Sequence, residues 1–130
     1  MSAIFKRGGI VPEMYGLSLT VYADEKTTGG QPLVFDAEAG DYGVKIASQG
    51  ERPDAVVKVG DDAGVPISAY VVTGGSRNAK VEVEEAVQVG DTVVASSNGI
   101  FEKESVGESA GAKGLLVLKG NENNTAEVLI

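Results

Sequence analysis

The sequence predicts an all-β protein: a small β-barrel or β-sandwich of short antiparallel strands with an extended N-terminal arm. Three observations lead to this prediction. The chain has 19 Val against 7 Leu and 6 Ile, and Val favours pleated strands because its χ1 angle is restricted. Its 18 Gly suit tight turns. Several segments alternate apolar and polar residues with the period of two that a half-buried strand requires.

The alternation is clearest in residues 17–23 and 79–84, where apolar and polar side chains change places at every step. Both segments fit antiparallel strands with one face in the core and one in water. Further strands are expected at residues 33–35, 44–47, 55–59, 67–72, 92–95, 100–103, 115–118 and 125–130. Glycine-rich and Asn-rich turns separate nearly all of these segments, as in small barrels and sandwiches.

The dipeptide Asn98-Gly99 is a strong hairpin signal. A two-residue loop would place Val94 opposite Lys103, whereas a four-residue loop over residues 96–99 places Val94 opposite Phe101 and Ala95 opposite Ile100. Apolar cross-strand pairs stabilise the second register, so the longer loop is predicted.

Helix signals are weak by comparison. Residues 83–89 could form a turn or two of helix, and residues 102–113 are predicted to be a loop because Gly107 and Gly111 interrupt them. The triplets at residues 59–61 and 89–91 are both Val-Gly-Asp. We interpret them as two similar turns at strand ends rather than as an internal repeat.

The chain divides into an extended arm, residues 1–16, and a β-rich body, residues 17–130. Gly8, Gly9, Gly16 and Pro12 interrupt the arm, and Pro limits regular pairing. The arm nevertheless carries apolar and cationic side chains that suit docking on a partner. These are Ile4, Phe5, Lys6, Arg7, Ile10 and Val11. The alternative, that this segment is simply a first strand of the body, is equally open.

Charge is unevenly distributed along the chain. The net charge is −8; Lys6 and Arg7 give the first twelve residues +2, which leaves −10 for the remainder. An acidic body repels phosphate backbones and anionic lipid surfaces, so neither nucleic acid nor a membrane is an expected partner. The sequence has no signal-peptide pattern and no apolar run of spanning length, so the product is expected to fold in the cytoplasm where it is made.

No catalytic, cofactor-binding or metal-binding residues are predicted. The sequence contains neither His nor Cys, which excludes Ser-His-Asp and Cys-His nucleophile systems. Asp36, Glu38 and Asp41 are possible acid–base groups, but nothing in the sequence marks two of them as an opposed pair. A small-molecule substrate is therefore not expected, and binding to another protein is the favoured activity.

Two other segments resemble ligand sites and lack the required pattern. Residues 107–114 have one residue between Gly111 and Lys113 and no following hydroxyl, so they do not form a phosphate-binding P-loop. Asp61-Asp62 could hold a cation through oxygen ligands, but Ala63 and Gly64 stand where an EF-hand needs further ligands. Both segments are interpreted as surface loops.

Several stretches together resemble the small capsid decoration, or cement, proteins of tailed bacteriophages. They are the leader ending near Gly16, the turn at residues 30–34 (GQPLV), the run at residues 86–99 (AVQVGDTVVASSNG), and the closing GLLVL and EVLI segments. The resemblance spans most of the chain, although its motifs are short and turn-like.

The resemblance implies a non-enzymatic structural protein of the virion. Such a protein sits on the outer capsid surface, commonly as a homotrimer, and stabilises contacts between subunits of the major capsid protein. The arm would lie along the capsid surface. Three alternatives remain: a tail, fibre or surface-adhesin module, a carbohydrate-binding β-sandwich, and, least favoured, an enzyme.

Overall fold

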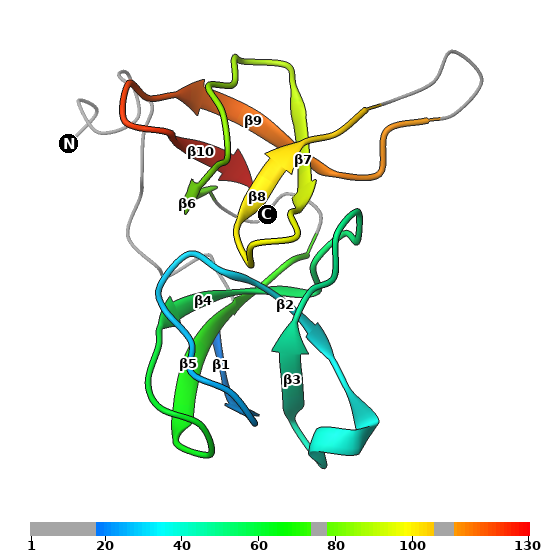
Figure 1. Cartoon of the computed structure of the whole chain (residues 1–130), viewed down its shortest axis with the longest axis vertical. Coiled ribbons are helices and arrows are strands. Elements are labelled where there is room, and N and C mark those ends of the chain that lie inside the picture. Colours follow the sequence, from blue (N-terminus) through cyan, green and yellow to red (C-terminus); the bar gives the residue numbers. More distant parts are fainter. Residues whose placement is uncertain (1–17, 74–77, 106–110) are drawn as a thin grey trace, which may run out of the picture.

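A computed structural model shows a protein whose regular secondary structure is almost entirely β-strand (Figure 1). The structure describes residues 18–73, 78–105 and 111–130. The predicted all-β fold is confirmed, with a five-stranded closed barrel followed by a second five-stranded sheet. In the described part of the chain no helix is long and apolar enough to cross a bilayer.

The first half of the chain forms the closed barrel, in the order β1-β3-β2-β4-β5. Its strands are β1 (Ser18–Ala23), β2 (Pro32–Phe35), β3 (Gly43–Ile46), β4 (Ala55–Val59) and β5 (Pro66–Val71), with the short 3-10 helix η2 (Ala37–Ala39) between β2 and β3. Small aliphatic side chains fill the interior, among them Val21, Leu33 and Val57. The barrel closes where β1 pairs in parallel with β3.

The second half forms a sheet in the order β6-β10-β9-β7-β8. Its strands are β6 (Asn78–Glu82), β7 (Thr92–Ala95), β8 (Phe101–Lys103), β9 (Leu115–Gly120) and β10 (Thr125–Leu129). Its core is built around Phe101, Leu115 and Ile130, all nearly or fully buried. A parallel bridge between Val83 and Phe101 joins the two ends of this sheet, as the β1–β3 pairing does in the first barrel.

The two sheets are copies of one fold, offset by 60 residues along much of their length. Pro32 pairs with Val56, and Thr92 pairs with Leu116. The Gly30 amide donates to the Val57 carbonyl at 2.8 Å, and the Gly90 amide donates to the Val117 carbonyl at 3.1 Å. The two halves are hereafter called the first and second barrels. The Val-Gly-Asp triplets occupy different places in this repeat, one after β4 and the other before β7.

The barrels pack on each other through a small apolar contact and backbone hydrogen bonds. Val34 and Ala47 of the first barrel form a cluster with Ala95 of the second. The Ala95 amide donates to the Glu51 carbonyl at 3.0 Å, and the Ala95 carbonyl accepts from the Gly50 amide at 2.8 Å. Val56, on the outer side of β4, also joins the second barrel's core cluster. The β3–β4 and β7–β8 loops therefore meet at the junction (Figure 1).

The β7–β8 hairpin corrects the predicted register. Ala95 lies opposite Phe101 and Val94 opposite Glu102, so the loop covers residues 96–100 and neither predicted register is formed. The Ser96 hydroxyl oxygen accepts hydrogen bonds from the amides of Asn98 and Ile100. This local capping stabilises a five-residue loop and leaves Ala95 and Phe101 paired across the hairpin, Ala95 at the junction and Phe101 in the core of the second barrel. The possible helix at residues 83–89 is not formed; those residues lead as bends and turns into β7.

Candidate protein-binding surfaces

The residues predicted to bind a partner lie outside the described part of the chain. Ile4, Phe5, Lys6, Arg7, Ile10 and Val11 all belong to residues 1–17. Their assignment to a partner-binding arm therefore stays a prediction. The surfaces that the structure describes belong to the body.

Polar grooves flank the junction between the barrels. One, of about 390 Å³, is lined by residues from both barrels, including Glu25, Gln31, Ser48, Ser97 and Asn98. A second lies beside β8 and includes Gln49, whose side-chain amide donates to Glu102 at 3.3 Å. Neither lining contains a Tyr or an Asp, the side chains that would mark a sugar-binding pocket, and the described residues contain no acidic cluster able to hold a metal ion.

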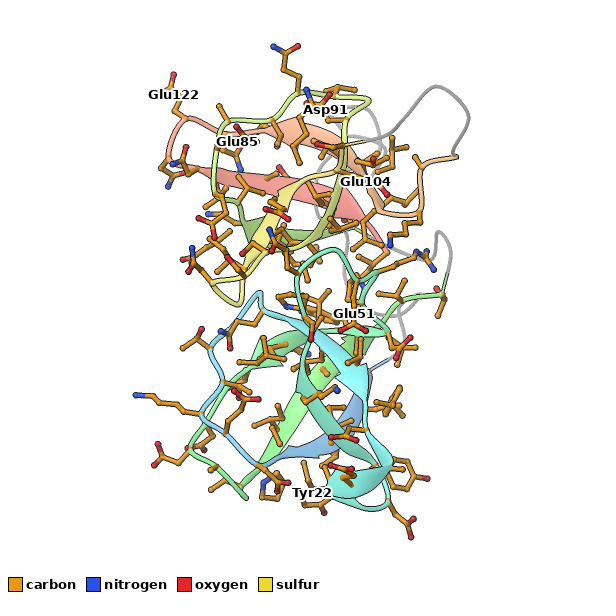
Figure 2. The ribbon with its side chains drawn as sticks, turned by 45° about the vertical axis from the view of Figure 1, so that its right-hand side comes forward. Tyr22, Glu51, Glu85, Asp91, Glu104 and Glu122 are labelled. Atoms are coloured by element: carbon orange, nitrogen blue, oxygen red, sulfur yellow. The ribbon has the colours of Figure 1, made fainter. Side chains whose placement is uncertain are left out.

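The carboxylate of Glu104 stabilises the connection between β8 and β9 in the second barrel. Glu104 follows β8 and accepts hydrogen bonds from the amides of Lys113 and Gly114 and from the Thr92 hydroxyl, at 2.8–3.1 Å. Partial burial acts to raise its pKa, but these hydrogen bonds and the nearby Lys113 charge outweigh it, so the pKa of Glu104 lies below its usual value. Glu104 thus ties together the two ends of the β8–β9 connection (Figure 2).

Aromatic side chains gather at the free end of the first barrel. Tyr22 is 42% exposed, Phe35 45% and Tyr42 63%. The Tyr22 amide donates to the Tyr42 carbonyl at 3.0 Å, and Phe35 pairs with Val44 on the adjacent strand. Tyr22 lies on β1, Phe35 is the last residue of β2 and Tyr42 directly precedes β3, all at the end facing away from the second barrel, where Figure 2 places Tyr22. Tyr22 alternates with buried Val21 and Ala23 and so points outward, whereas Phe35 lies on the core face of its strand and is exposed at the barrel's mouth. We call this group the aromatic end.

An acidic turn lies beside the aromatic end. The turn between β2 and β3 carries Asp36, Glu38 and Asp41 and no basic residue. Asp36 caps η2 by accepting a hydrogen bond from the Glu38 amide at 3.1 Å. The three carboxylates considered above as acid–base candidates thus lie on one exposed turn, and neither of the two grooves described above includes them.

A second exposed apolar surface lies on β9. Leu116 and Leu118 alternate with buried Leu115 and Val117 and point outward, each about two-fifths exposed. Position 116 corresponds to Val56 in the first barrel, which is only 1% exposed because it packs at the junction. The same position is thus buried in one barrel and open in the other.

The sequence could not reveal these surfaces. A pattern of apolar residues in strands predicts burial, and Tyr22 and Phe35 sit in such strands. Their exposure depends on where the barrel ends and on which face the second barrel covers. The one sequence signal that could have drawn attention to the turn is the run of acidic residues interleaved with Ala, Gly and Tyr at residues 36–42.

The fold is similar to that of a phage head protein. Neither a protein-family model nor a curated protein matches the sequence. Among solved structures, the N base of the head fiber protein gp8.5 of bacteriophage phi29 is similar to this chain, with a TM-score of 0.65 and 16% identity. The likeness covers 88% of this chain and 93% of that one. At this identity the likeness establishes the fold, so the two chains share one architecture.

Proposed function

We propose that this chain is a non-enzymatic structural protein of a phage virion that binds the outer surface of the head and stabilises contacts between major capsid protein subunits. The observation that supports the proposal most strongly is the fold, which matches a phage head fiber base over almost the full length of both chains. The resemblance of the turn motifs to capsid decoration proteins supports it independently.

Physical features of the chain are consistent with this role. A chain without His lacks the commonest general base, and one without Cys lacks a thiol nucleophile. Binding to assembled heads and not to free capsid subunits would stabilise the shell by mass action. Because many copies act on one shell, modest affinity at each position is sufficient.

The proposal assigns the arm and the body different tasks. Ile4, Phe5, Ile10 and Val11 would dock on the shell by apolar contact, and Lys6 and Arg7 would pair with acidic groups of the major capsid protein. An extended segment can bind in this way by adding a strand to an exposed sheet edge. The body would associate as a homotrimer, which would add buried area to a protein with few large core side chains.

Mixing the purified chain with emptied heads tests the proposal. Wild type should cosediment with expanded heads and not with free capsid subunits. A chain lacking residues 1–11 should remain folded by circular dichroism and lose most of its binding. Wild type that stays in the supernatant would contradict head binding, and full binding by the shortened chain would contradict the role of the arm.

A second candidate role is the base of a fibre, since the similar solved structure is named as a head fiber base. On that role the chain would anchor a longer appendage on the head rather than clamp capsid subunits. Heads loaded with the chain and heated would distinguish the roles. A clamp raises the temperature at which the shell opens, whereas an anchor leaves it unchanged.

A further inference from the structure

We propose that the aromatic end, made of Tyr22, Phe35 and Tyr42 and bordered by Asp36, Glu38 and Asp41, is a docking surface for a protein partner that presents basic residues around an apolar pocket. On the function proposed above, on which this inference rests, that partner is the shell of the phage head. The contact is separate from the one proposed for the arm, and of opposite charge.

Most of the aromatic residues that the structure describes lie at the aromatic end and not in the core. Aromatics make up only 5% of the chain. Large aromatic side chains normally contribute much of the area buried in a protein core. Of the aromatic residues that the structure describes, Phe101 is fully buried and Tyr70 partly buried, while the other three are exposed at the aromatic end. Tyr is among the residues most enriched at the energetic centres of protein interfaces.

The repeat shows which residues of the second barrel correspond to the aromatic end. Phe35 pairs with Val44 as Ala95 pairs with Phe101, so Phe35 corresponds to Ala95 and Tyr42 to Gly99. In the second barrel these small residues let the β7–β8 loop pack on the first barrel. A Cβ on Gly99 would come within 3.3 Å of Gln31 Nε2 and 3.5 Å of Ile46 Cγ2.

The first barrel carries large side chains at the positions where the second barrel needs small ones. A second copy could not pack on the aromatic end with the geometry of the internal junction, because Phe35 and Tyr42 would occupy the space. The end therefore suits a different partner, one with a pocket that receives aromatic side chains.

The backbone of Tyr42 adopts a left-handed conformation. Its φ is +57°, and the corresponding Gly99 has a φ of +78°. Left-handed backbone is unfavourable for a side chain such as Tyr and costs Gly little. The first barrel keeps a bulky exposed residue at a position where Gly would be the more stable choice, as expected where stability is exchanged for binding.

Charge identifies the chemistry of the partner. The turn holding Asp36, Glu38 and Asp41 contains no basic residue, and none of the three carboxylates forms an ion pair with a described residue. An uncompensated acidic border around an apolar centre favours a surface of opposite sign. A basic border on the shell therefore fits better than the acidic body of another copy.

The test measures binding to emptied heads assembled from the cognate major capsid protein. Three variants are compared with wild type by cosedimentation: Y22S/Y42G at the aromatic end, D36N/E38Q/D41N on its border, and L116S/L118S on the outer side of β9 as the matched control. All the substituted side chains but Asp36 are well exposed, so each variant should fold, and circular dichroism and thermal melting check this.

The proposal predicts at least a tenfold loss of affinity for Y22S/Y42G. It predicts a smaller loss for D36N/E38Q/D41N together with a weaker dependence on salt, and no change for the β9 control. The single variant Y42G should bind more weakly while melting at a temperature no lower than wild type, which a purely structural role for Tyr42 would not produce.

Different failures have different meanings. If wild type binds and Y22S/Y42G binds equally well, the aromatic end is not the docking surface, while head binding itself stands. If wild type does not bind, the proposed function fails and this inference with it. If Y22S/Y42G keeps head binding but changes the oligomeric state, the surface belongs to a contact between copies and the proposal is wrong.

Discussion

The two barrels share one fold but differ at the turn that follows their second strand. In the second barrel this turn packs on the first barrel through Ala95 and Gly99. In the first barrel the same turn carries Phe35 and Tyr42 and points away from the rest of the molecule (Figure 1). One scaffold can thus build an internal junction or an exposed end, depending on side-chain size at two positions.

The largest effect should come from comparing two phenylalanines. Phe101→Ala removes a fully buried ring from the second barrel and should lower the free energy of unfolding by about 3–5 kcal/mol. Phe35→Ala removes a half-exposed ring from the first barrel and should cost about 1 kcal/mol or less. Urea unfolding measures both. Equal losses would show that Phe35 is a core residue and would remove it from the aromatic end.

Equivalent glycines test whether the barrels are true structural copies. A Cβ on Gly60 would collide with the Thr27 carbonyl, and a Cβ on Gly120 would collide with the Val87 carbonyl. Gly60→Ala and Gly120→Ala should each destabilise by about 1–3 kcal/mol, because strands must shift to admit a methyl group. Gly111→Ala, which has open space around it, is the neutral control. A large loss of stability in only one of the two variants would show that Gly60 and Gly120 are not structurally equivalent.

Glu104 of the second barrel should make the free energy of unfolding depend on pH. Its folded pKa is lowered, so its contribution is present above its unfolded pKa and is lost as the pH falls through the lower folded pKa. Glu104→Gln should cost about 1–2 kcal/mol at pH 7 and flatten the loss of stability below about pH 4.5. Urea midpoints from pH 7 to pH 3 measure this. Glu122→Gln, an exposed control, should leave the profile unchanged; an unchanged profile for Glu104→Gln would argue against its bridging role.

The smallest effects come from exchanging residues between the two turns. Gly99→Ala should cost about 1 kcal/mol, since the position has positive φ and is close to Gln31 and Ile46. Tyr42→Gly should gain up to about 1 kcal/mol, because it relieves left-handed backbone at an exposed site. Thermal melting at matched concentration checks both signs. A loss of stability in Tyr42→Gly would mean that its side chain supports the barrel.

Much of the fold could be predicted from the sequence. Each segment expected to be a strand is one, and the bounds of β4 and β7 are as predicted, because alternation and glycine turns act locally. The 60-residue repeat is not apparent in the sequence. The barrels share paired positions and turn glycines such as Gly30 and Gly90, while most other residues differ, so the repeat becomes visible only through hydrogen bonds and register.

The candidate surface could not be predicted for a related reason. Whether Val56 or Leu116 is buried depends on which barrel covers it, and that is a property of the tertiary arrangement. The predicted hairpin register is wrong because of Ser96. Its hydroxyl oxygen accepts hydrogen bonds from two loop amides, which favours a longer loop than apolar pairing alone predicts. The predicted arm lies outside the described residues, and its role stays a prediction.

Imaging heads by electron cryo-microscopy after mixing them with the chain tests the central claim most directly. The account predicts added density at fixed positions on the outer surface, into which both barrels fit with Tyr22 and Tyr42 facing the shell. Heads that carry no added density, in the presence of folded chain at saturating concentration, would contradict it.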